Sequence, residues 1–257
     1  MIALPLLTLL LAADPAAEAR RSALAELRAA EQPQLALSDP ARAEAAIEVC
    51  RERLARAGDN LPEPRAAQLA EALVTAARKG ALPPRLASRA LHAVAETRGH
   101  LGQPMADALA AIALEGPAGL RADATEVLGE VGDGRHVAVL ARLAEEPALA
   151  EAAATALGRI GGKGVAAAFA QGIADAGAPT DARLALLRAA AKRELREAAP
   201  AAIQALGEPA LAAEARKATL RLARKSDLAL LRKAREDSKD AATRGALGRL
   251  IERLEKA

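Results

Sequence analysis

Three arginines, Arg188, Arg221 and Arg249, occupy the same position in successive helical segments of the carboxy-terminal third, five residues after each segment begins. Parallel helices packed side by side would place these side chains in a row, at a helix spacing of about 8–10 Å. Lys217 and Arg224 flank Arg221 on the same side, within helical turns. The pattern predicts a basic surface for an acidic protein segment or an anionic polymer. The alternative is a set of ordinary solvated arginines.

The carboxy-terminal third is basic as a whole. Residues 181–257 contain 18 Lys and Arg against 11 Asp and Glu, whereas residues 1–180 contain 18 basic and 22 acidic residues. Such an excess arises from ordinary helix surfaces, and it also favours an anionic partner. Nucleic acid is the less favoured partner, because single-stranded bases stack on aromatic side chains and Phe169 is the single aromatic residue of the sequence.

The residue types that carry catalysis form no recognisable set in this sequence. His92, His100 and His136 are dispersed and lack the spacing of zinc ligands such as H-E-x-x-H. Cys50 is the single cysteine, so no intramolecular disulfide or thiol pair is possible, and its apolar surroundings predict a core residue. The sequence therefore predicts no catalytic residues, no metal site and no cofactor.

Two further patterns match functional motifs in part. Residues 161–164 read Gly-Gly-Lys-Gly but lack the full spacing of a phosphate-binding loop, so we interpret them as a turn between repeats. Glu145 and Glu146 are adjacent and precede Pro147, and adjacent helical residues do not face each other. We interpret the two glutamates as solvated residues at a helix end.

The composition predicts an all-α protein. Hydrophobic residues make up 52% of the 257 residues, and Trp and Tyr are absent. Ala, Leu, Arg and Glu favour helices, whereas β-branched and aromatic residues favour strands. A core without rings suits regular stacking of helices better than one large globular core.

Helix start and stop signals recur along the chain. The stretch from Asp133 to Gly161 has the pattern of a helical hairpin, with Asp133 as N-cap, Pro147 at the first position of the second helix and Gly161 just past its end. First helices of successive pairs begin near residues 104, 134, 163, 195 and 227. This period predicts a solenoid in which each hairpin covers the apolar face of the next. Residues 104–257 form the clear array, and residues 14–103 hold two longer, degenerate pairs.

The amino terminus is apolar over residues 2–13, apart from Thr8. Twelve residues are too few to cross a bilayer, which takes about 20, but they suit the apolar region of a secretory signal peptide. We predict a signal peptide over residues 1–13 and a periplasmic or secreted protein of the bacterial envelope, without a transmembrane segment after signal removal. No Lys or Arg precedes the run, and the alternative is a buried amino-terminal helix in a cytoplasmic protein.

The repeats resemble HEAT repeats, of the short kind also found in phycobilin lyases. The resemblance rests on the first helix at residues 198–206, which contains Pro200, and on the Ala-Leu-Gly-Arg-Ile-Gly sequence at residues 156–161. It covers about residues 104–256 and implies a right-handed superhelix of antiparallel helix pairs, whose second helices line the concave side and bind a partner. In similar repeats, the residue near the start of each second helix forms hydrogen bonds to neighbouring carboxylates or loop carbonyls. The resemblance therefore implies a structural role for Arg121, Arg183, Arg216 and Arg244.

Enzymes with similar repeats use residues that this chain lacks. Deoxyhypusine hydroxylase has His-Glu pairs, whereas Ala93, Leu101 and Val137 follow the three histidines. HEAT-like alkylpurine DNA glycosylases hold the base with aromatic residues. We therefore predict a non-enzymatic scaffold for protein–protein interaction. Two alternatives stay open: a HEAT-like lyase or assembly factor acting on a protein-bound cofactor, and a binder of anionic polymer or nucleic acid through the basic third.

Overall fold

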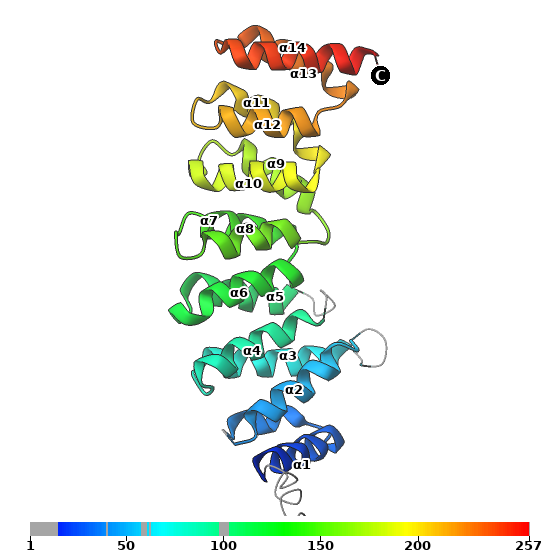
Figure 1. The fold of residues 1–257 in the computed structure, drawn as a ribbon, viewed down its shortest axis with the longest axis vertical. Coiled ribbons are helices and arrows are strands. Elements are labelled where there is room, and N and C mark those ends of the chain that lie inside the picture. The colour runs from blue at the N-terminus through cyan, green and yellow to red at the C-terminus, as the bar shows by residue number, and fades with distance from the viewer. Residues whose placement is uncertain (1–14, 40, 58–60, 62, 98–102, 257) are drawn as a thin grey trace, which may run out of the picture. The chain divides into compact units, whose positions relative to one another are not determined.

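The computed structural model describes residues 15–39, 41–57, 61, 63–97 and 103–256; the predicted signal segment lies outside these ranges. Every helix or strand element among the described residues is a helix, which confirms the all-α prediction. The chain divides into two compact units, Met1–Thr97 and Arg98–Ala257, and each unit is described separately (Figure 1).

The first unit contains four α-helices and one 3-10 helix in its described part. Pro83 and Pro84 open the last helix, and Gly80, with a φ of 69°, follows the preceding one. The second helix contacts every other helix of the unit and is the centre of its core, with Leu54 fully buried. The elements are α1 (Pro15–Ala29), η2 (Pro33–Ser38), α2 (Ala43–Leu54), α3 (Glu63–Arg78) and α4 (Pro84–Ala95).

The second unit is a series of helical hairpins that follow one another in chain order, from green to red in Figure 1. Short 3-10 turns precede three of the first helices, and a fourth such turn follows one of these three helices. The elements are α5 (Gln103–Glu115), α6 (Ala118–Val131), η3 (Gly134–His136), α7 (Val137–Leu143), α8 (Ala150–Arg159), α9 (Val165–Ala174), α10 (Thr180–Arg193), η4 (Arg196–Ala198), α11 (Ala199–Gln204), η5 (Ala205–Gly207), α12 (Ala212–Leu222), η6 (Lys225–Asp227), α13 (Leu228–Asp237) and α14 (Ala241–Lys256).

Helix contacts in the second unit join each hairpin to the next. The first helices α5, α7, α9, α11 and α13 contact one another in that order, and so do the second helices α6, α8, α10, α12 and α14. The core between hairpins consists mainly of Ala, Leu, Ile and Val side chains, and Phe169 of α9 is fully buried in it. Each apolar helix face is thus buried against its own partner and its sequence neighbours.

The helix starts follow the predicted signals with one difference. Asp133 is an N-cap, because its carboxylate accepts the N–H of Arg135 at 3.0 Å. Pro147, however, lies three residues before α8, because Leu149 donates to the carbonyl of Glu146 at 2.8 Å and closes a separate turn.

Glycine allows two close approaches between neighbouring hairpins. A Cβ atom at Gly129 of α6 would lie 2.5 Å from Cα of Ala156 in α8. A Cβ atom at Gly134 would lie 2.6 Å from the carbonyl carbon of Gly164, and the Gly134 N–H donates to the carbonyl of Lys163 at 3.3 Å. The Gly-Gly-Lys-Gly segment is therefore a turn against the preceding hairpin, as expected from the sequence, with φ values of 83° and 78° at Gly162 and Gly164.

Candidate binding surface on the second helices

Two residues of the predicted basic surface, one from the row of three arginines and one that flanks it, converge on one carboxylate. Arg188 of α10 approaches Oε1 of Glu214 with its Nε at 3.8 Å, and Lys217 of α12 donates to the same oxygen at 2.9 Å. The Arg188 and Lys217 side chains are 62% and 69% exposed, whereas that of Glu214 is 19% exposed. The structure therefore places Arg188 and Lys217 on one surface, with a partly covered glutamate between them.

Arg221 and Arg224 lie around the carboxy-terminal end of α12. Nε of Arg221 lies 3.4 Å from Oε1 of Glu194, the residue that ends α10 in the left-handed conformation with a φ of 57°. Nη1 of Arg224 donates to the carbonyls of Arg221 and Ala223, at 3.1 and 2.9 Å. Arg224 therefore caps its own helix end and has fewer donors left for a ligand than the sequence suggested.

Arg249 is the freest member of the row. It is exposed on α14, which packs against α12, and the contacts within the described residues give it no ion pair or hydrogen bond. The three predicted arginines thus lie on three second helices in contact, α10, α12 and α14, but the ion pairs join just the first two of these helices.

The surface carries more positive than negative charge. Two carboxylates, those of Glu194 and Glu214, face the cations Arg188, Lys217 and Arg221, while Arg224 and Arg249 have no acidic partner among the described residues. Exposed ion pairs contribute little free energy, typically about 0–1 kcal/mol each. An incoming carboxylate can therefore displace the exposed Glu194 from Arg221 at small cost.

A second set of arginines is structural, as expected from the repeat resemblance. Arg121 donates through Nε to the carbonyl of Ala113 at 2.8 Å and through Nη2 to Glu146 at 2.7 Å. Arg183 does the same with the carbonyl of Ile173 and the carboxylate of Glu208, at 2.8 and 2.6 Å. These hydrogen bonds lower the pKa of both glutamates. The corresponding arginines of the last two second helices each make one of these two contacts. Arg216 lies 3.5 Å from the carboxylate of Asp240, and Arg244 donates to the carbonyl of Ser238 at 2.9 Å.

Glu146 is 42% exposed just past the end of its helix, as the interpretation as solvated residues expects, whereas Oε1 of Glu145 is buried without a hydrogen-bond partner. The Glu146 carboxylate also binds Arg121, and Glu146 follows that arginine by 25 residues, as Glu208 follows Arg183. The spacing of 25 residues between arginine and glutamate is the pattern in the sequence that both acceptors share. Both acceptors hold the turn before a second helix to the preceding hairpin.

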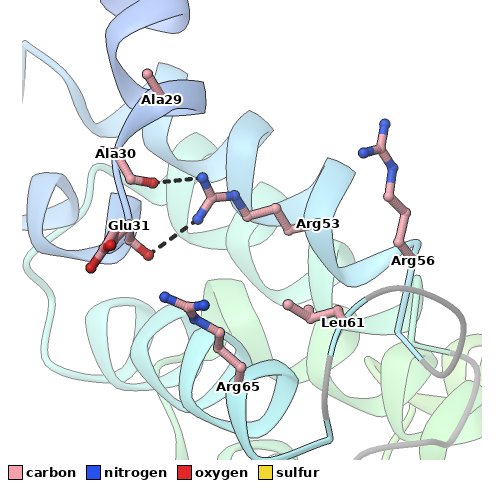
Figure 2. A pocket seen from close by; sticks show the side chains of 7 residues that line it. All are labelled: Ala29, Ala30, Glu31, Arg53, Arg56, Leu61 and Arg65. Carbon is pink, nitrogen blue, oxygen red and sulfur yellow. Dashed lines mark hydrogen bonds between the residues drawn. The ribbon is translucent and has the colours of Figure 1, made fainter.

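The first unit holds an arginine-lined pocket that the sequence patterns did not indicate. The pocket has a volume of about 350 Å³ and is lined by Ala29, Ala30, Glu31, Arg53, Arg56, Leu61 and Arg65. Figure 2 shows Arg53 and Arg65 extending toward the end of α1, whereas Arg56 points away from them. Three arginines, from α2, α3 and the intervening segment, therefore line the pocket together with a single glutamate, and two of them extend toward the end of α1.

Within the described part of the chain, no group of three or more His, Cys, Asp and Glu side chains can hold a metal ion. His136 is buried and serves as a link between helices, with Nε2 3.0 Å from Oδ1 of Asp107. None of the helices described is both long and apolar enough to cross a membrane. No known protein family matches the chain, and no curated protein matches it.

Proposed function

We propose that the chain is a HEAT-like α-solenoid that works as a non-enzymatic scaffold and binds an acidic segment of a partner protein. The solenoid is supported by the order of the helix contacts, since first helices contact first helices and second helices contact second helices along Arg98–Ala257. In such an array each repeat contacts its neighbours, and the stacked second helices offer one continuous surface.

One observation carries the choice of partner. Arg188 and Lys217 come from two different helices and meet at the same oxygen of Glu214, so the helix stack gathers cations that are distant in sequence. A flexible acidic peptide laid across α10, α12 and α14 would exchange with Glu194, bind the exposed Arg188 and Lys217, and add a partner for Arg249. Arginine suits this role because its planar fork binds carboxylates through two parallel hydrogen bonds.

The test is binding of a fluorescently labelled Glu-rich peptide to the full chain, followed by anisotropy. The variant Arg188→Glu/Arg221→Glu/Arg249→Glu is expected to bind at least about tenfold more weakly at moderate ionic strength. The matched control is Arg142→Glu/Arg196→Glu/Arg235→Glu, which makes the same change in net charge at exposed arginines on or beside first helices. It is expected to retain most of the affinity.

Two results would count against the proposal. Equal loss of affinity in both triple variants would mean that net charge attracts the peptide without a defined surface. Tighter binding of duplex DNA than of the peptide, with the same dependence on the three arginines, would identify a nucleic-acid or polyanion binder instead.

The proposed place of action is the bacterial envelope, and it rests on the apolar run at residues 2–13. Expression of the full chain in a Gram-negative host, followed by cell fractionation and mass spectrometry of the amino terminus, tests this. Periplasmic protein that begins near Asp14 is the expected result. Uncleaved protein confined to the cytoplasm would contradict it.

A further inference from the structure

We propose that the arginine-lined pocket of the first unit binds a small organic anion, through a carboxylate or phosphate group held by Arg65 and Arg53. The site is independent of the basic surface on the second helices, since all of its lining residues belong to the unit Met1–Thr97. Its volume of about 350 Å³ lies within the range of small-molecule sites.

Arg53 is held in a fixed position by the end of α1. Its Nη2 donates to the carbonyls of Ala30 and Arg28 at 2.6 and 2.9 Å, and its Nη1 donates to the carbonyl of Glu31 at 3.2 Å. These carbonyls are at the carboxy-terminal end of the helix, where the last turn leaves acceptors unpaired. The three bonds leave two of the five N–H donors of the guanidinium for a ligand.

Arg65 supplies the donors that the fold does not use. It lies in the first turn of α3, lines the same pocket, and extends across it toward Glu31 and Arg53 (Figure 2). The hydrogen bonds and ion pairs of the described residues leave its guanidinium without a partner. Two guanidinium groups that line one hollow repel each other, and an oxyanion between them removes this repulsion and accepts from both.

A narrower hollow extends the pocket and adds two side-chain amides. It has a volume of about 80 Å³, shares Glu31, Arg53, Leu61 and Arg65 with the pocket, and is also lined by Gln34 and Gln68. The amide groups of Gln34 and Gln68 can both donate and accept hydrogen bonds. A ligand that carries a hydroxyl or amino group beside its anionic group would find hydrogen-bond partners on these two amides.

The experiment is calorimetric titration of the full chain with four probes: inorganic phosphate, glycerol phosphate, acetate and glycolate. Saturable binding of a probe is the expected result, and the hydroxyl-bearing member of a pair is expected to bind more tightly than its plain counterpart. Whether the phosphate pair or the carboxylate pair binds more tightly identifies the source of the anionic group.

The variants Arg65→Gln and Arg78→Gln separate a site from general attraction. Both residues are exposed arginines of α3, and Arg78 does not line the pocket. Arg65→Gln is expected to weaken binding at least about tenfold, whereas Arg78→Gln is expected to change it less than about twofold. The proposal is overturned if no probe binds saturably, or if both variants lose affinity equally.

Discussion

The carboxylate of Glu208 accepts hydrogen bonds from both terminal nitrogens of Arg183, with Nη2 donating to Oε1 at 2.6 Å. Nε of the same guanidinium donates to the carbonyl of Ile173 at 2.8 Å. The Arg183 side chain is 6% exposed. A single buried group therefore joins the end of α9, the first turn of α10 and the turn that precedes α12, and it couples two successive hairpins.

Removal of this guanidinium is expected to destabilise the protein. Arg183→Met should lower the free energy of unfolding by about 2 kcal/mol, because the Ile173 carbonyl loses its donor and Glu208 loses its partner, although Glu208 is half exposed and can be hydrated. Arg188→Met, at an exposed arginine of the same helix, should change it by less than about 0.5 kcal/mol. Urea unfolding followed by circular dichroism measures both, and equal losses would contradict the structural role of Arg183.

Acid is expected to weaken the paired carboxylates. Hydrogen bonds from Arg183, Arg51 and Arg28 hold the pKa values of Glu208, Glu48 and Glu52 below the ordinary value of 4.5. A hydrogen bond from Arg121 lowers the pKa of Glu146 in the same way. As pH falls, the unfolded chain binds protons at these sites before the folded protein does, so the stabilisation is complete above pH 4.5 and is lost as pH falls through the lowered values.

The free energy of unfolding measured in urea at a series of pH values tests this dependence. Near neutral pH these groups should make the free energy of unfolding almost independent of pH. From about pH 4.5 downward the free energy of unfolding should decrease steadily. The variant Glu208→Gln should start from a lower value and decrease less steeply, because one of the titrating groups is gone. An unchanged slope in that variant would show that the Arg183–Glu208 contact does not contribute to the dependence.

A methyl group added at Gly129 is expected to separate α6 from α8. Its Cβ would lie 2.5 Å from Cα of Ala156, which is backbone and cannot move aside alone. Gly129→Ala should therefore cost about 1–3 kcal/mol despite the better helix propensity of alanine. Gly158→Ala in α8 is the matched control, because an added Cβ there meets nothing within 4 Å, and it should be neutral or stabilising.

The same variant tests the proposed solenoid. If stability is a sum of local and nearest-neighbour terms, Gly129→Ala should accelerate amide hydrogen exchange mainly in α5 to α8 and leave α13 and α14 almost unchanged. Exchange measured by mass spectrometry gives this comparison by segment. Uniform acceleration over Arg98–Ala257 would indicate one cooperative globular core instead.

Cys50 is expected to be inert in the folded protein. Burial raises the pKa of its thiol to about 12, and the residue has no exposed surface. Because the thiolate is the reactive form, an aromatic disulfide reagent should react with Cys50 no faster than the protein unfolds, and at the rate of a free thiol in urea. Rapid labelling without denaturant would show that α2 opens easily.

Local signals predicted most of the helix pattern. Asp133 is an N-cap because its carboxylate reaches the N–H of the second residue on, which is a property of the residue type and its position. The distance in sequence between successive first helices is set by the length of one hairpin. The starts of the first helices could therefore be predicted from the regular period of the sequence. The structural role of the arginines at the start of the second helices was implied by the resemblance to other repeats, and the contacts of Arg121 and Arg183 confirm this role.

Features that depend on how distant segments approach each other could not be predicted. The charge on the row is lower than its arginines suggested, because Glu194 ends α10 in the left-handed conformation and reaches Arg221. The pocket arises where the end of α1 meets α2 and α3, and Arg53 and Arg65 share no motif. The ion pair of Glu146 could not be predicted because its partner, Arg121, lies one hairpin earlier.

The hairpin of α11 and α12 contains both an acceptor for the preceding hairpin, Glu208, and a donor toward the following one, Arg216. A tandem duplication of this hairpin would insert one new acceptor together with one new donor. The copy could thus join the chain without stranding a charge at either junction. Lengthening of the array by gene duplication therefore needs no compensating substitution at these contacts, which makes the number of hairpins easy to change during evolution or design.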